Sequence, residues 1–203
     1  MSRAFTGDRL VIASHNRGKL AEFSALLAPR NVACISAADL GLPEPDETES
    51  TFVGNARIKA RAAALATGLP ALSDDSGITI DALDGAPGVY TADWAETPNG
   101  RDFVMAMTKT WAKLETISAP FPRRAQFRCT LLLCWPDGHE EVFEGIAPGT
   151  LVWPRRGSDG HGYDPMFQPD GHTQTFAEMP EAQKNAISHR GQAVAALLQA
   201  CFT

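Results

Sequence analysis

Two short apolar segments, each ending in polar residues, constrain the fold of this chain most strongly. Residues 10–13 (LVIA) run directly into residues 14–19 (SHNRGK), after which apolar residues recur at helical spacing. Residues 72–73 (LS) run directly into residues 74–77 (DDSG). A buried strand followed at once by a helix is typical of α/β proteins. One basic and one acidic strand end together indicate a metal-dependent enzyme that acts on a nucleotide.

The rest of the chain alternates between the two kinds of element. Apolar spacing predicts helices over residues 19–27, 51–67 and 101–116, and a last helix with Ser188 as its N-cap. Strands are predicted at residues 31–35, 71–73, 78–83, 125–135, 140–145 and 150–153, with turns at 74–77 and 148–149. Residues 39–50 and 157–171 are predicted loops. Helices first, strands in the middle and a final helix indicate a mixed α/β domain.

Length and composition bound the class of protein. A chain of 203 residues, 44% of them hydrophobic, suffices for one sizeable core, and we predict a single domain over residues 1–203. The net charge of −6 argues against nucleic acid as a partner. Residues 1–8 lack the apolar core of a signal peptide, and no segment approaches the ~18 apolar residues of a membrane span. We therefore expect a cytoplasmic protein with no membrane partner.

The cysteine pattern gives no sign of a metal site. None of the four cysteines forms a Cys-x-x-Cys pair, and buried thiols in a reducing compartment are expected. Cys129 and Cys134 differ by an odd number within one predicted strand, so their side chains are expected on opposite faces.

The first polar segment has the features of an anion site. Backbone N–H groups at a helix start favour an anion, Gly18 permits close backbone approach, and Lys19 adds a positive charge. The Gly-x-x-x-x-Gly-Lys-[Ser/Thr] spacing of a P-loop is absent. The alternative is an ordinary strand-to-helix turn.

The acidic residues could hold a divalent cation. Magnesium prefers a few carboxylates together with water and phosphate oxygens, and Glu47 and Asp75 stand at two predicted element ends. A carboxylate beside the metal could also deprotonate water. The alternative reading of residues 74–77 is a solvated turn.

Two further groups of residues could contact a nucleotide. On the alanine-rich helix, Thr51, Asn55 and Lys59 are four apart and share one face, although a surface helix with alternating charge has the same pattern. Near the C-terminus, residues 160–165 (GHGYDP) are followed by Lys184 and residues 188–190 (SHR). There an arginine could donate to an oxygen on a base edge, and an aspartate could accept from ring N–H groups.

Taken together, these segments resemble the inosine/xanthosine triphosphate pyrophosphatase family, whose members remove deaminated purine nucleotides. The resemblance runs in order from about residue 10 to residue 198. The segments that carry it are SHNRGK at 14–19, ET and TF within 47–52, NA and KA within 55–60, DDSG at 74–77, G and PGVY within 85–90, GYDP at 162–165, AEM at 177–179, and K184 with SHR at 188–190. One segment alone would be weak, but their order and spacing are highly specific.

The resemblance implies a single elongated α/β domain with a long mixed sheet, two lobes and a central nucleotide cleft. It also implies a homodimer. The implied reaction is hydrolysis of ITP, dITP or XTP between the α and β phosphates, giving the monophosphate and pyrophosphate. The implied cofactor is Mg²⁺.

The resemblance further implies roles for individual residues. Asp75 would be the general base and, with Glu47, a magnesium ligand, while Asp46 and Asp74 are second candidates for the metal. The residues implied to bind the triphosphate are Ser14, His15, Asn16, Arg17, Gly18, Lys19, Asn55 and Lys59, with Ser76 as a further substrate contact. Those implied to form the nucleoside pocket are His161, Gly162, Tyr163, Asp164, Lys184, His189 and Arg190.

Three positions depart from the family pattern. His161 stands where phenylalanine is usual before Gly-Tyr-Asp-Pro, which affects base stacking. Gly54 replaces a glutamate near the presumed metal and lowers helix propensity. Asp93 stands where a basic residue is common. None of these changes removes a residue implied to be essential.

Three other readings compete with this one. A Maf-like pyrophosphatase for modified pyrimidine nucleotides shares the general architecture, but residues 162–165 and 188–190 argue against it. A nucleotide sensor without activity is disfavoured by the intact Lys19, Glu47 and Asp75. An α/β domain of unrelated function would not explain the ordered segments.

Overall fold

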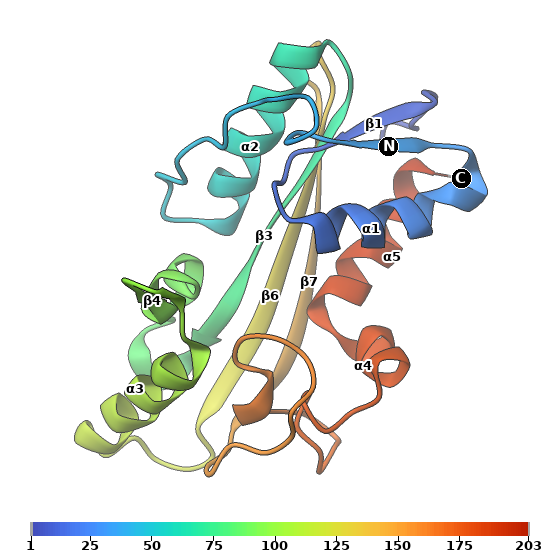
Figure 1. Cartoon of the computed structure of the whole chain (residues 1–203). Coiled ribbons are helices and arrows are strands. Elements are labelled where there is room, and N and C mark those ends of the chain that lie inside the picture. The colour runs from blue at the N-terminus through green and yellow to red at the C-terminus, as the bar shows by residue number, and fades with distance from the viewer. Residues whose placement is uncertain (1, 203) are drawn as a thin grey trace. The chain divides into compact units, whose positions relative to one another are not determined.

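The structure is a computed structural model. It describes residues 2–202, with the exception of the Glu22 side chain. The helices of this part of the chain are α1 (Arg17–Leu27), α2 (Phe52–Thr67), α3 (Phe103–Thr116), α4 (Glu181–Ile187) and α5 (His189–Cys201) (Figure 1). The main sheet is formed by β1 (Arg9–Ile12), β2 (Ala33–Ser36), β3 (Ala71–Ile80), β6 (Arg124–Cys134), β7 (Glu140–Leu151) and β8 (Phe167–Pro169). A separate antiparallel pair consists of β4 (Glu96–Thr97) and β5 (Gly100–Arg101).

The main sheet is mixed. Its six strands follow the order β2-β1-β3-β6-β7-β8. Strand β1 pairs in parallel with both β2 and β3, whereas β7 and β8 pair antiparallel. The predicted α/β class with a long mixed sheet is therefore confirmed.

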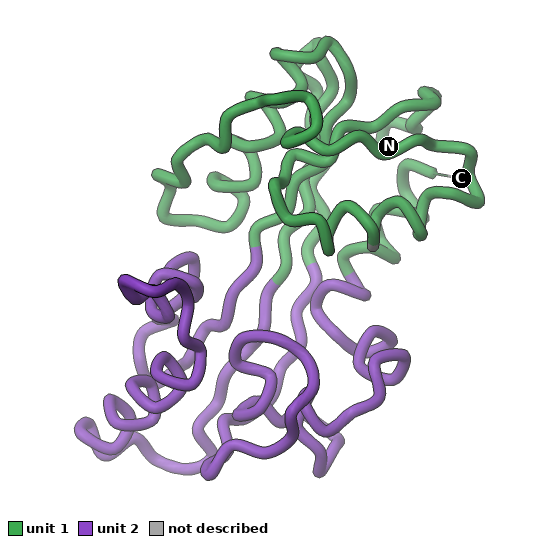
Figure 2. The backbone as a smooth tube through the Cα atoms, in the orientation of Figure 1, with its two compact units in different colours: residues 1–75, 129–144, 193–203 green, residues 76–128, 145–192 purple. Residues whose placement is uncertain are grey.

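The chain divides into two compact units (Figure 2). Unit 1 comprises residues 1–75, 129–144 and 193–203, and unit 2 comprises residues 76–128 and 145–192. Strands β3, β6 and β7 each contribute residues to both units. Each unit has its own hydrophobic core.

In unit 1, apolar side chains fill both faces of the strands. On one face, helices α1 and α5 cover a core that includes Leu10, Leu72 and Cys129. On the other face, the alanines of α2 pack against a second core that includes Cys134. Small side chains let α2 lie close to the strands. The two cysteines thus lie on opposite faces, which confirms the prediction from their odd spacing.

In unit 2, one core packs around aromatic and long apolar side chains. Ile78 and Ile80 from β3 and Met107 and Leu114 from α3 are buried in it, together with Phe167 of β8. Met107 and Leu114 are seven residues apart and therefore lie on one face of α3, the face that is buried.

The predicted turn at residues 74–77 is wrong. These residues lie within the continuous strand β3, so the two strands predicted on either side of them are one. Ser73, Asp74 and Asp75 are 2%, 3% and 7% exposed, whereas a solvated turn would leave its carboxylates in water. Local composition favours a turn here, and only the burial of both carboxylates by other segments explains the strand.

The predicted turn at residues 148–149 is also wrong. Strand β7 continues through it, and Gly149 lies opposite Pro169 of β8. A Cβ atom at Gly149 would lie 2.4 Å from the Gln168 carbonyl oxygen, so this glycine permits close strand approach rather than a turn. Strand β8 itself lies in what was predicted as a loop, and helix α4 was not predicted.

The ends of two helices follow the predicted local chemistry. Thr51 caps α2 by accepting a hydrogen bond from Gly54 N at 3.1 Å, and Gly68 ends the helix with a left-handed φ of 66°. Ser188 Oγ accepts from Gly191 N at 3.1 Å at the start of α5. The predicted N-cap at Ser188 is confirmed, whereas Thr51, predicted as the first helical residue, is the N-cap of α2.

We expect Gly54→Ala to destabilise the protein although alanine is the better helix former. A Cβ atom at position 54 would lie 2.5 Å from Glu49 Cβ and 2.9 Å from Thr51 Oγ1. Alanine gains about 1 kcal/mol in helix propensity, but overpacking costs roughly 1–3 kcal/mol. Urea unfolding should show a net loss of about 1 kcal/mol. Ala62→Gly, on the exposed face of the same helix, is the control for propensity alone. A more stable Gly54→Ala variant would contradict the steric argument.

Candidate active site

The segment between β1 and α1 is built around Asn16. Its side-chain oxygen accepts hydrogen bonds from the backbone N–H groups of Gly18 at 2.8 Å and Lys19 at 3.4 Å. Its own N–H donates to Ser14 Oγ at 3.1 Å. Asn16 is therefore the N-cap of α1, as its extended backbone requires. The cap satisfies two of the N–H groups that the sequence assigned to an anion, which leaves side chains such as Lys19 for phosphate contacts. Arg17 is exposed at the first position of the helix.

Lys19 reaches from α1 to the middle of β3. Its ammonium group lies 2.7 Å from Asp74 Oδ1, and the Asp74 side chain is 3% exposed. The ion pair fixes the first turn of α1 against the strand. Asp74 is thus a buried counter-ion of Lys19, and its place as a second candidate for the metal stays a prediction.

Helix α2 presents two buried polar side chains to the site. Asn55 is 2% exposed, and its side-chain oxygen accepts from the backbone N–H of Glu49 at 2.9 Å. Lys59 is 8% exposed and forms an ion pair with Glu47. The predicted shared face of Asn55 and Lys59 is therefore the buried face of the helix. Both residues hold the acidic segment that precedes it, and Asp46 of that segment is exposed.

Asp75 lies on β3 and titrates abnormally. The pKa of its carboxyl is raised from 3.8 to about 6, mainly by burial and to a smaller extent by the negative charges of Glu47 and Asp74. The Lys59 ammonium and a hydrogen bond with Asn55 oppose the shift. Adjacent residues of a strand point to opposite faces of the sheet. Asp74 therefore interacts with Lys19 of α1, and Asp75 interacts with Asn55 and Lys59 of α2. A carboxylate with a raised pKa beside a second carboxylate is a candidate catalytic base.

The residues present fit a magnesium ion. Glu47 and Asp75 are close enough that the charge of one raises the pKa of the other, an unfavourable arrangement that a bound cation would relieve. Among residues 2–202, no cluster of three or more histidine, cysteine or acidic side chains is arranged as a complete metal site. Magnesium does not need one, because one or two carboxylates, water and substrate phosphates complete its coordination.

In unit 2, a glycine-rich segment is folded around Asp164. Gly160 and Gly162 have left-handed φ angles of 77° and 65°. A Cβ atom at Gly160 would lie 2.2 Å from Asp164 Oδ2, so only glycine fits there. The carboxylate accepts from His161 N at 2.6 Å and pairs with Lys184. These contacts leave the His161 side chain exposed.

Tyr163 belongs to the core of unit 2. It is 1% exposed, its hydroxyl lies 3.3 Å from Thr110 Oγ1, and its ring meets Phe103 edge to face. Its side chain is therefore not available to a ligand in this structure. Tyr163 therefore contributes to the predicted pocket by fixing its chain neighbours Gly162 and Asp164 in position.

His189 and Arg190 begin helix α5. The imidazole of His189 stacks on Phe127 of β6, with ring centroids 4.9 Å apart and planes 11° from parallel. Arg190 is half-buried beside it in the chain, and Ser76 of β3 is half-buried as well. No local pattern indicates Phe127 as the support of His189, because the two residues are 62 positions apart in the chain.

The structure thus gathers the predicted residues into two sets. Unit 1 holds the predicted triphosphate and metal residues, and the contacts of Lys19, Glu47, Lys59 and Asp75 link α1, the acidic segment, α2 and β3. Unit 2 holds the predicted nucleoside residues.

Comparison with known proteins gives the chain its family. The model of the Ham1 family matches residues 10–200. The chain belongs to the Ham1 family. A relative from Ruegeria pomeroyi named dITP/XTP pyrophosphatase is 69% identical over 202 residues, which is 100% of this chain and 99% of the relative. One with the same name from Rhodospirillum centenum is 58% identical, with 98% of each chain covered.

Solved structures of Ham1 proteins have the same fold. A HAM1 protein from Coxiella burnetii superimposes with a TM-score of 0.89 at 40% identity and covers 94% of this chain and 96% of its own. A nucleoside-triphosphatase / dITP/XTP pyrophosphatase from Mycobacterium abscessus gives 0.79 at 39% identity, with coverages of 94% and 98%. The resemblance to pyrophosphatases of this kind is thus confirmed at the level of the family. No helix within residues 2–202 has the length and apolar character needed to cross a membrane.

Proposed function

We propose that this Ham1 protein hydrolyses deaminated purine nucleoside triphosphates (ITP, dITP and XTP) to the monophosphate and pyrophosphate. The observation that carries the proposal is the 69% identity, over the full chain, to a protein named dITP/XTP pyrophosphatase. The side chains of unit 1 have the chemistry that this reaction requires. Removal of aberrant nucleotides from the precursor pool would be its purpose in the cell.

In the proposed reaction, water attacks the α-phosphorus and the bond to the bridging oxygen breaks, so that pyrophosphate leaves. Asp75 accepts the proton of the attacking water, a role that suits a carboxyl with a pKa near 6. Lys19 and Lys59 bind the charged phosphates, and Asn16 holds the segment between β1 and α1 in place. In exchange for phosphate contacts, the two lysines loosen their ion pairs with Asp74 and Glu47.

Glu47 and Asp75 would hold Mg²⁺ as the cofactor. When bound, the ion supplies positive charge to phosphate oxygens and lowers the pKa of a coordinated water. The observation that supports this assignment is the mutual repulsion of the two carboxylates, which burial at Asp75 makes costly.

Base recognition is assigned to unit 2. Inosine and xanthosine carry an oxygen at purine C6, where adenine carries an amine. Arg190 at the start of α5 would donate to this oxygen, and an unmatched buried donor costs ~1–3 kcal/mol, which disfavours adenine. His161 and His189 supply rings for stacking. Asp164 Oδ2 accepts from His161 N and from Lys184, which positions the loop at residues 160–162, and the carboxylate has further acceptor capacity for a ring N–H of the base.

The protein is further proposed to act in the cytoplasm as a homodimer. Both proposals follow from the family resemblance and the nature of the substrate. Light scattering of the purified chain would test the dimer.

Pyrophosphate release with inosine, xanthosine, guanosine, adenosine and pyrimidine triphosphates tests the function. We expect turnover of the inosine and xanthosine nucleotides, at least about 100-fold above ATP in kcat/KM, and loss of turnover when EDTA removes the metal. Preference for pyrimidines would indicate a Maf-like activity. Nucleotide binding without turnover would indicate a sensor.

A further inference from the structure

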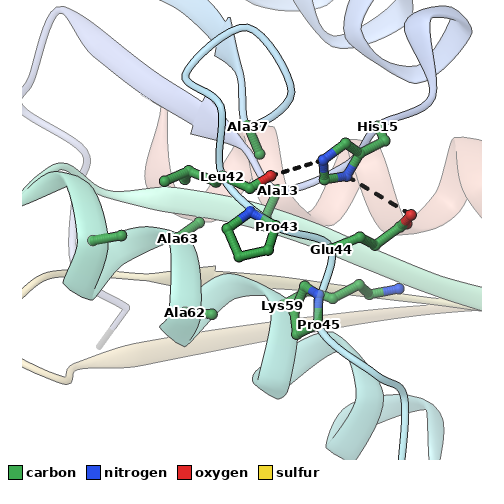
Figure 3. A pocket seen from close by; sticks show the side chains of 11 residues that line it. Ala13, His15, Ala37, Leu42, Pro43, Glu44, Pro45, Lys59, Ala62 and Ala63 are labelled. Atoms are coloured by element: carbon green, nitrogen blue, oxygen red, sulfur yellow. Dashed lines mark hydrogen bonds and ion pairs between the residues drawn. The ribbon is translucent and has the colours of Figure 1, made fainter.

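His15 belongs to residues 14–19 between β1 and α1, here called the phosphate-binding loop. Its side chain points away from this loop and toward residues 42–44 of the acidic segment that precedes α2 (Figure 3). Its Nε2 atom lies 2.9 Å from the carbonyl oxygen of Leu42, and its Nδ1 atom lies 3.8 Å from Glu44 Oε2 (Figure 3). A carbonyl oxygen only accepts, so Nε2 carries the proton and donates it. The separation of 3.8 Å is too long for a hydrogen bond, so the contact with Leu42 is the directional one.

The segment after Leu42 has few other attachments. Leu42 itself is held by a backbone hydrogen bond to Ala37 O at 3.0 Å. Within the part of the chain that the structure describes, no backbone–backbone hydrogen bond involves residues 43–48. Pro43 and Pro45 have no N–H to donate. The next attachments along the chain are the side-chain contacts of Glu47 with Lys59 and of Glu49 N with Asn55.

A pocket beside His15 explains why this segment needs a support. The pocket is a small cavity of about 110 Å³ that lies between residues 43–45 and the alanines of α2 (Figure 3). Its lining is mostly apolar, with Leu42, Ala62 and Ala66 among the residues. Leu42 packs against the core that contains the α2 alanines, whereas residues 43–45 face α2 across the pocket, of which His15 forms one wall.

We propose that His15 is a positioning residue that holds residues 42–47 to the phosphate-binding loop and thereby sets the place of the Glu47 carboxylate. The inference rests on the proposed function, because Glu47 matters as a metal ligand. Through this contact, the loop that binds the triphosphate and the segment that binds the metal keep a fixed geometry. His15 then acts on catalysis through Glu47 and need not touch the phosphate.

Three variants separate this role from a general effect on folding. His15→Leu keeps a bulky side chain at the pocket wall but cannot donate. His15→Gln can place its amide nitrogen near the position of Nε2 and donate to Leu42 O. His172→Leu makes the same chemical change in unit 2 and is the control.

The first readout is amide hydrogen exchange without metal or nucleotide. We expect His15→Leu to accelerate exchange at the two hydrogen-bonded amides that flank the segment, Leu42 N and Glu49 N, by roughly 3- to 10-fold, the effect of one lost hydrogen bond, with His15→Gln near wild type. The second readout is direct titration with Mn²⁺ by electron paramagnetic resonance, in which His15→Leu should weaken binding by a similar factor. Because neither readout needs turnover, they are informative even if the proposed substrate is wrong.

Enzyme kinetics completes the test. His15→Leu should raise the Mg²⁺ concentration for half-maximal activity by the same roughly 3- to 10-fold, and His15→Gln should return it to near the wild-type value. Unchanged exchange in His15→Leu, equal acceleration throughout unit 1, or a His15→Gln variant as impaired as His15→Leu would overturn the proposal. An inactive wild-type protein with the expected exchange and Mn²⁺ results would overturn only the proposed function.

Discussion

Replacing Asp75 with asparagine is expected to abolish pyrophosphate release and, at the same time, to stabilise the metal-free protein above pH 6. Loss of a general base alone costs about 10²–10⁴ in rate, and Asp75 is also a proposed metal ligand. We therefore expect kcat to fall at least about 10³-fold. Residual activity within tenfold of wild type would remove Asp75 from the role of base.

The stabilisation follows from the direction of the pKa shift. The folded protein holds the Asp75 proton up to a pKa of about 6, against 3.8 for the ordinary carboxyl. Between these values the folded state binds more protons than the unfolded state, so stability falls as pH rises through this window. Above pH 6 the folded protein bears the full free-energy cost of ionising the buried carboxyl. The difference of 2.2 between the two pKa values corresponds to on the order of 3 kcal/mol. Asparagine has no charge to desolvate.

Urea unfolding at pH 4 and pH 8 in EDTA measures this effect. Asp75→Asn should gain up to about 3 kcal/mol over wild type at pH 8 and little at pH 4. Asp39→Asn, an exposed aspartate of the same unit, controls for the change in net charge. Equal stability of Asp75→Asn and wild type at pH 8 would mean that burial does not strain the carboxylate. The expected result is that Asp75, which the proposed reaction needs, lowers the free energy of unfolding of the protein.

Replacing Lys184 with methionine is expected to destabilise unit 2 and to weaken substrate binding. The Asp164 side chain is 4% exposed and that of Lys184 is 18% exposed. Removing one partner of a buried ion pair costs roughly 3–5 kcal/mol because the remaining charge stays buried. Since Lys184 is partly exposed, we expect a loss of about 2–3 kcal/mol. The KM for ITP should rise as the loop at residues 160–162 loses its support.

The double variant Asp164→Asn/Lys184→Met identifies the cause. An asparagine oxygen can still accept from His161 N, but it carries no charge to bury. The double variant should therefore be more stable than Lys184→Met alone, by about 1–2 kcal/mol in urea unfolding. If the two substitutions are additive, the ion pair is not what couples these residues. Lys113→Met, on α3 of the same unit, is the control for loss of a lysine.

Local sequence patterns predicted the elements whose stability is local. The cap predicted at Ser188 is set by a neighbouring backbone group, and the structure has it; a left-handed glycine, Gly68, likewise ends α2. The patterns failed at residues 74–77 and at Gly149, where polar or small residues favour a turn by composition. In both places, contacts with segments that are distant in the chain stabilise the strand instead.

The sequence by itself determined the family, the order of the elements and the chemical types of the site residues, because these depend on residue identity and spacing. Tertiary structure decided how the residues are used. Asp74 and Asp75 are neighbours in sequence, but β3 directs one to Lys19 and the other to Lys59 and Asn55, and burial then gives Asp75 its raised pKa. Burial and partners come from segments that are distant in the chain, and local spacing carries no record of them.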